Sequence, residues 1–76
     1  MNKPKILVKV VYKSGVVKKV FSRKRRRIVN FFKADNFKDC LIEVNVDYEN
    51  DRYNRGVYKT KKDSLAALKA FLESGI

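Results

Sequence analysis

The chain has no histidine and a single cysteine, Cys40. The lack of histidine excludes histidine general-base catalysis, serine-type catalytic triads and histidine metal sites. One cysteine forms neither an intramolecular disulfide nor a zinc site. The acids at 43, 47, 49 and 51 follow one strand and turn, a pattern more typical of solvated charge than of a catalytic pair. We therefore expect a non-enzymatic protein with no metal and no cofactor.

Long apolar runs and glycine-rich segments are also missing. No stretch approaches the ~18 apolar residues of a membrane span, and no glycine-rich phosphate loop is present. The apolar run 6–8 is broken by Lys9 and precedes no small-residue cleavage site, so it predicts no signal peptide. These features favour a soluble, intracellular (cytoplasmic) protein with no membrane partner.

Acidic residues are few and unevenly placed. The 76 residues contain 19 Lys and Arg against 8 Asp and Glu, a net charge of +11. Residues 1–38 hold 13 of the cations and one acid, Asp35, whereas residues 39–76 are nearly neutral. With 45% hydrophobic residues, the chain is apolar enough to form one folded domain, 1–76. The asymmetry indicates one strongly basic surface.

The first half of the chain has the pattern of two strands and a helix. Residues 6–12 alternate apolar and other side chains, as a strand does. Ser14-Gly15 predicts a turn, and 16–21 a returning strand. Ser22 is a suitable cap for a helix that continues to about Lys33.

The second half repeats this order. Residues 40–48 alternate most clearly, 49–51 form a turn, and 53–59 return as a strand. Thr60 caps a second helix, and Gly75 is placed to end it. The apolar face of this helix consists of Leu65, Leu68 and Leu72.

These elements predict an α+β fold of order ββαββα. We expect one four-stranded antiparallel sheet with both helices on one face. The two halves, about 4–36 and 39–75, suggest an internal ββα duplication, and two unrelated ββα units are the alternative. The junctions 20–25 and 57–63 match if one residue is inserted.

A run of five cations, Arg23 to Arg27, lies between the predicted cap and the apolar helix face. The first turn of a helix disfavours positive charge by ~0.3–1 kcal/mol per group. The second helix instead has Asp63 three residues after its cap, an arrangement close to a capping box. In this alignment Arg25 replaces Asp63, so an anionic partner is the leading explanation for the run.

A helical projection divides the predicted basic site. Arg23, Arg26, Asn30 and Lys33 fall on the side opposite Ile28 and Phe32. Lys24 and Arg25 lie on the core side in the first turn, Arg27 lies on a flank, and the preceding strand supplies two further lysines. The candidate nucleic-acid or acidic-partner contacts are Lys18, Lys19, Arg23, Lys24, Arg25, Arg26, Arg27, Asn30 and Lys33.

The uncovered face of the sheet is expected to be polar. It would present Glu43, Asn45 and Asp47 beside Lys9 and Lys13, whose charges neutralise one another across the strands. The aromatic residues Phe37, Tyr53 and Tyr58 are interpreted as packed rather than as base-stacking platforms. This face is the weaker candidate site.

Known modules offer one partial resemblance. The order ββαββα differs from the RRM and the double-stranded RNA-binding domain, and no RNP or GxxG motif is present. Residues 55–68 (RGVYKTKKDSLAAL) resemble the final strand-to-helix passage of the arm-type DNA-binding domains of tyrosine integrases. That family reads DNA with a small antiparallel sheet, and the resemblance implies DNA binding.

The leading hypothesis is a sequence-tolerant nucleic-acid-binding protein, for DNA or RNA, that grips backbone phosphates at the start of the first helix. The alternative is an inhibitor or adaptor, of the kind many phages and viruses make, docking on an acidic protein surface. An ordinary solvated helix face and a nuclear localisation signal are the remaining interpretations of the basic run.

Overall fold

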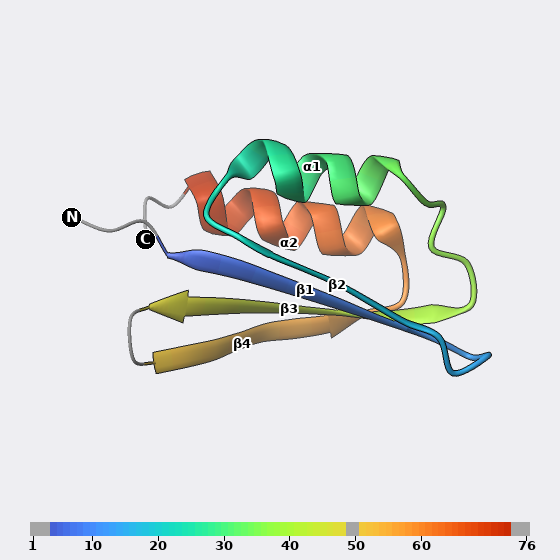
Figure 1. Ribbon diagram of the computed structural model, residues 1–76. Helices are drawn as coiled ribbons and strands as arrows, with labels where there is room; N and C mark the ends of the chain where they lie inside the picture. Colours follow the sequence, from blue (N-terminus) through green and yellow to red (C-terminus); the bar gives the residue numbers. More distant parts are fainter. Residues whose placement is uncertain (1–3, 49–50, 74–76) are drawn as a thin grey trace.

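The computed structural model describes residues 4–48 and 51–73 and consists of two layers, a sheet and a pair of helices (Figure 1). The elements are β1 (Lys5–Tyr12), β2 (Val17–Ser22), α1 (Arg25–Lys33), β3 (Cys40–Tyr48), β4 (Asp51–Tyr58) and α2 (Lys61–Glu73). The strand order is β2-β1-β3-β4 with all neighbours antiparallel, and both helices cover one face. The predicted α+β fold class and sheet are confirmed.

The turn between β1 and β2 forms where the sequence predicts it. Gly15 has φ +94°, a conformation that glycine adopts without strain. Its amide donates to the Tyr12 carbonyl at 2.9 Å, and the Tyr12 amide donates to Val16 at 2.9 Å. Of the turn predicted at 49–51, Asp51 is instead the first residue of β4. Residues 49–50 and the predicted glycine cap at Gly75 lie outside the described residues.

The core lies between the sheet and the helices, as the alternation in the two central strands requires. The even-numbered residues from Ile6 to Val10 in β1 and from Cys40 to Val46 in β3 face the helices and are buried. From the helix layer Ile28 and Phe32 of α1 and Leu68 of α2 pack against them, each at most 3% exposed. The buried strand residues of the core are Ile6, Val8, Val10, Cys40, Ile42, Val44 and Val46.

The loop between α1 and β3 adds one aromatic side chain to this core. Phe37 is 3% exposed and has φ +54°. Its ring lies 5.6 Å from Phe32 in an edge-to-face arrangement and 5.7 Å from Phe31. Phe37 is therefore packed, as predicted, and is not a base-stacking surface. Tyr58 is half-buried against the core, whereas Tyr53, which was also expected to be packed, is 49% exposed.

The two halves of the fold correspond at a constant offset of 36 residues. The pairing Ile6↔Ser22 in the first hairpin has the same register as Ile42↔Tyr58 in the second. Two residues separate strand from helix in each half, so the insertion predicted at the junction is not needed. Buried residues that correspond are Ile6 and Ile42, Val8 and Val44, Val10 and Val46, Ile28 and Ser64, and Phe32 and Leu68. Common ancestry of the halves stays a prediction.

Neither helix in the ranges 4–48 and 51–73 combines the length and the apolar character needed to cross a membrane.

Candidate nucleic-acid interface

The start of α1 differs from the prediction. Helix α1 begins at Arg25, and its N-cap residue is Lys24, whose side chain makes no capping hydrogen bond. Ser22 is the last residue of β2, paired with Ile6. Its hydroxyl accepts a hydrogen bond from the Lys24 amide at 2.9 Å and does not reach the helical turn. The expectation that Ser22 caps the helix was wrong because the strand ladder extends through this residue.

The observed start of α1 changes which of its residues is equivalent to Asp63 of α2. With Lys24 as the cap, the third helical position of α1 is Arg27 rather than Arg25. In α2 the Thr60 hydroxyl accepts from the Asp63 amide at 3.1 Å, and Asp63 places an acid in the first turn. The first turn of α1 contains no acid. The contrast between the helices therefore lies at the cap and at the third position.

The first two positions are cationic in both helices but are used differently. Arg25 and Arg26 correspond to Lys61 and Lys62. The Lys61 ammonium donates to the Asp35 carbonyl at 3.0 Å and lies 5.8 Å from the Phe37 ring centroid, so Lys61 contributes to packing. In residues 4–48 and 51–73, no carboxylate forms an ion pair with the side chain of Arg25 or Arg26.

The basic residues of α1 and of the linker that precedes it, residues 23–24, are exposed to solvent. All five side chains from Arg23 to Arg27 are exposed. On the helix itself Arg26, Asn30 and Lys33 are exposed on the side opposite the buried Ile28 and Phe32. This exposed stripe runs for about 10 Å along the helix axis at 1.5 Å per residue.

The two lysines predicted to extend this site point to opposite faces of the sheet. Lys18 faces the helix side beside Val10 and forms an ion pair with Asp35 at 2.9 Å. Lys19 points to the opposite face of the sheet, directly across from Lys9. Consecutive strand residues alternate faces, so Lys19 is on the far side of the sheet from α1, while Lys18 faces the helix layer and is engaged by Asp35.

Asp35, the one acid of the first 38 residues, is engaged away from the arginines. Its carboxylate accepts hydrogen bonds from the Tyr12 hydroxyl, the Lys18 ammonium and the Phe37 amide. The bonds from Tyr12 and Lys18 hold the pKa of Asp35 well below its usual range. Asp35 thus stays ionised and fixes the loop after α1, and it does not neutralise the helix start.

The free backbone donors complete the arrangement. The earliest helical amide bonds of α1 join Arg27 and Ile28 to the Lys24 carbonyl, at 3.1 and 3.4 Å. The amides of Arg25 and Arg26 precede these bonds, as the first amides of every helix do. Two such donors beside several guanidinium groups form a favourable environment for an anion that carries several oxygens, such as a phosphate.

Exchanging the cap and third-position residues between the two helices tests whether Lys24 and Arg27 lower the stability of the fold. The variant Lys24→Thr with Arg27→Asp gives α1 the cap and the acid of α2. We expect its free energy of unfolding to rise by ~1–2 kcal/mol, since a threonine cap contributes ~1 kcal/mol and an acid in the first turn ~0.3–1 kcal/mol. Urea denaturation measures this change. The reverse exchange, Thr60→Lys with Asp63→Arg, is the matched control and should destabilise. A less stable first variant would show that Lys24 or Arg27 supports the fold.

Cys40 has no role in this site. The side chain is 8% exposed within the core, and burial raises the pKa of its thiol, which keeps it protonated. Among residues 4–48 and 51–73, no group of three or more potential metal ligands occurs.

Comparison with protein-family models, curated proteins and solved structures finds no match to this chain. The segment resembling the integrase arm-type domain forms the end of β4 and the first turns of α2. The candidate interface therefore rests on the geometry of this chain alone.

Proposed function

We propose that the protein is a non-enzymatic nucleic-acid-binding module that holds backbone phosphates at the start of α1. One observation carries the proposal. Three arginines occupy the first three positions of a helix that has neither a side-chain cap nor an acid in its first turn. Such an arrangement disfavours the folded state locally, and phosphate groups remove that disadvantage by supplying the missing negative charge.

The contacts proposed for the interface are Arg23, Lys24, Arg25, Arg26, Arg27, Asn30 and Lys33. The arginines among them suit this role because the planar guanidinium group donates two parallel hydrogen bonds to a phosphate. Six of these seven contacts are cations, which pair with backbone phosphates whatever the base sequence. Binding should therefore tolerate sequence changes and depend mainly on charge.

A salt titration with four polymers tests the proposal. Single- and double-stranded DNA and RNA of one length are titrated by fluorescence anisotropy at several salt concentrations. For a duplex, the logarithm of the association constant should fall linearly with log salt, with a slope near −0.9 per phosphate neutralised. Affinity that scarcely changes between low and moderate salt would contradict the proposal. Tight one-to-one binding to an acidic protein without binding to any polymer would favour the inhibitor or adaptor hypothesis.

A further inference from the structure

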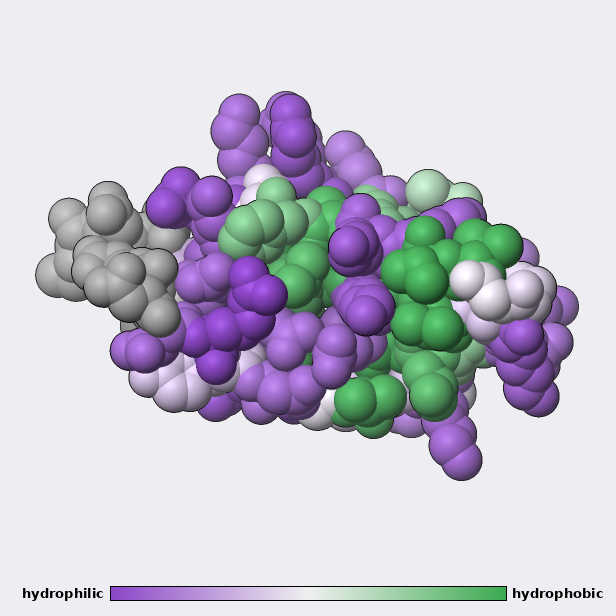
Figure 2. Space-filling view, turned by 60° about the horizontal axis from the view of Figure 1, so that its bottom comes forward, coloured by the Kyte–Doolittle hydropathy of each residue, from purple (hydrophilic) through white to green (hydrophobic). Residues whose placement is uncertain are grey.

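The uncovered face of the sheet carries exposed apolar side chains beside the charged residues that the sequence predicts there. Val11, Val17, Leu41 and Val57, here called the aliphatic cluster, are 38%, 47%, 49% and 53% exposed. Val11 lies directly opposite Val17 on one side and Leu41 on the other. Val57 pairs with Glu43, which follows Leu41 on the same face of β3. Figure 2 shows apolar side chains gathered at the end of the sheet that holds the β1–β2 turn.

This grouping differs from scattered surface hydrophobics. Seven large apolar residues are exposed in the described part of the chain, and five of them, the aliphatic cluster and Phe21, share this face. The core is already complete on the other face of the sheet. Contiguous exposed apolar patches rimmed by polar residues mark interaction sites.

The rim of the aliphatic cluster is basic. Lys9 and Lys19 lie directly opposite each other, a like-charge pairing that destabilises a sheet. Glu43, across from Lys9, accepts a hydrogen bond from the side-chain amide of Asn54 at 2.9 Å. Two lysines against one glutamate leave this part of the rim with a net positive charge beside the apolar surface.

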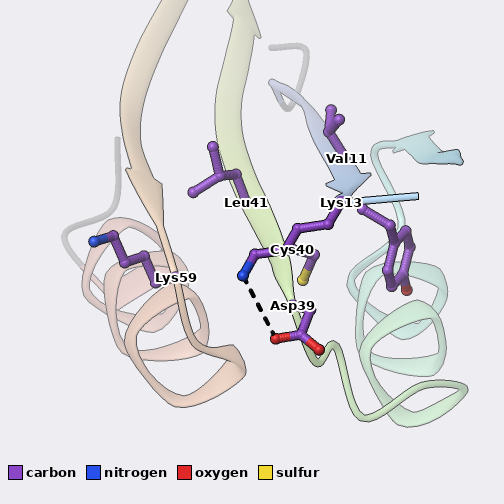
Figure 3. Close-up of a pocket in the computed structure, with 7 residues that line it drawn as sticks. Val11, Lys13, Asp39, Cys40, Leu41 and Lys59 are labelled. Carbon is purple, nitrogen blue, oxygen red and sulfur yellow. Dashed lines mark ion pairs between the residues drawn. The ribbon is translucent and has the colours of Figure 1, made fainter. Parts of the chain in front are cut away.

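A pocket at the end of the cluster extends this basic rim. It has a volume of about 580 Å³, and its lining includes Val11 and Leu41 together with Lys13 and Lys59. Figure 3 shows the two lysines on either side of Leu41, with Lys13 reaching toward Asp39. That ion pair spans 4.0 Å between largely exposed side chains, so it is weak. An anionic group can therefore compete for Lys13.

Charge and side-chain type identify the occupant. A second copy of this chain would bring another net charge of +11 and the same basic rim, so self-association is disfavoured. Bases of single-stranded nucleic acid stack on aromatic rings. The aromatic residue on this face, Phe21, already has the Lys5 ammonium 4.8 Å and the Arg52 guanidinium 5.8 Å from its ring centroid. Aliphatic side chains beside lysines instead suit a protein segment with apolar and acidic residues.

We propose that the open face of the sheet is a docking surface for an acidic amphipathic protein segment. Its apolar side chains cover the aliphatic cluster, and its carboxylates pair with Lys9, Lys19, Lys13 and Lys59. This surface lies on the face of the sheet opposite α1, so the proposal is independent of phosphate binding.

A labelled peptide tests the docking surface. The probe is a short fluorescein-labelled peptide with Leu and Phe on one face and Asp and Glu on the other. A control peptide replaces Leu and Phe by Ser. The protein should bind the first peptide at least about tenfold more tightly than the second. The variant Leu41→Thr with Val57→Thr should weaken that binding at least about tenfold, while its binding to duplex DNA stays unchanged.

A second variant, Val11→Thr with Val17→Thr, keeps the test decisive if the first does not fold. Circular dichroism establishes that each variant is folded. Equal binding of the two peptides, or unchanged binding by both variants, would overturn the proposal. So would an equal loss of affinity for single-stranded DNA or RNA in these variants, because the face would then be a nucleic-acid surface.

Discussion

Replacing Arg25, Arg26 and Arg27 together by glutamine should weaken binding to duplex DNA roughly 100-fold at about 0.1 M salt. All three side chains are exposed at the first three positions of α1. Each phosphate contact that is lost should make the log–log salt slope less negative by ~0.9, or by nearly 3 for the set. Glutamine keeps the length and polarity of the side chains, so the fold should be retained. Anisotropy titrations at several salt concentrations measure both quantities.

The control for this prediction has the same net charge. The variant Lys9→Gln, Lys19→Gln, Lys59→Gln also loses three cations, but from the open face of the sheet and its edge. It should reduce DNA affinity by only a few fold, through the long-range field alone. If the two variants lose affinity equally, binding follows net charge and the start of α1 is not a site.

The substitution Gly56→Ala should lower the free energy of unfolding by ~2–4 kcal/mol. Gly56 lies in β4 beside a register shift of the β3–β4 ladder and has φ +128°, a conformation that costs a non-glycine residue ~1–3 kcal/mol. A Cβ here would lie 2.6 Å from the Tyr58 hydroxyl oxygen, so the ring must move. That movement also breaks the 2.8 Å hydrogen bond from Tyr58 to the Arg55 carbonyl, worth ~1 kcal/mol.

Gly15→Ala separates the two contributions. Gly15 also has positive φ, +94°, but an added Cβ would meet nothing within 4 Å. This variant should lose only the ~1–2 kcal/mol of backbone strain. Chemical denaturation of both variants gives the comparison. If Gly56→Ala is no more destabilising than Gly15→Ala, the contact between the added Cβ and Tyr58 contributes nothing to the loss of stability.

The sheet and its core could be predicted because alternation is a direct consequence of strand geometry. The even-numbered residues of β1 and β3 are apolar, and a strand with that pattern has one face to bury. Periodicity also predicted that Ile28 and Phe32 form the buried face of α1, since helical spacing puts them on one side. These predictions depend on local periodicity, which one sequence contains.

The start of α1 could not be located from the residue types alone. Serine before a helical pattern is a good cap, but hydrogen bonding between β1 and β2 decides whether Ser22 belongs to the strand or to the helix. That pairing extends to Ser22 and moves the cap to Lys24. Contacts between distant segments therefore moved the start of the helix two residues along the chain from its predicted position.

The open face was predicted only in part. Lys9 and Glu43 lie directly opposite each other on it, as expected, but Asn45 is 6% exposed, and the exposed apolar residues were not predicted. The alternation of the strands places Val11 and Leu41 on the open face. The sequence prediction for this face was instead based on charge pairing between Lys9 and Glu43. That these apolar residues are neighbours follows only from the strand register, which puts Val11 between Val17 and Leu41. Lys13, expected on this face, lies beyond β1 and pairs with Asp39.

Amide chemical-shift changes on binding provide the most direct test of the central claim, that the start of α1 holds phosphate groups. The ¹⁵N-labelled protein is titrated with a short DNA duplex at low salt. The largest changes should fall on the backbone amides of Arg25 and Arg26, which precede the first helical hydrogen bond, and on neighbouring residues of the linker. Largest changes on β1 and β2 across the open face, with α1 unaffected, would contradict the account.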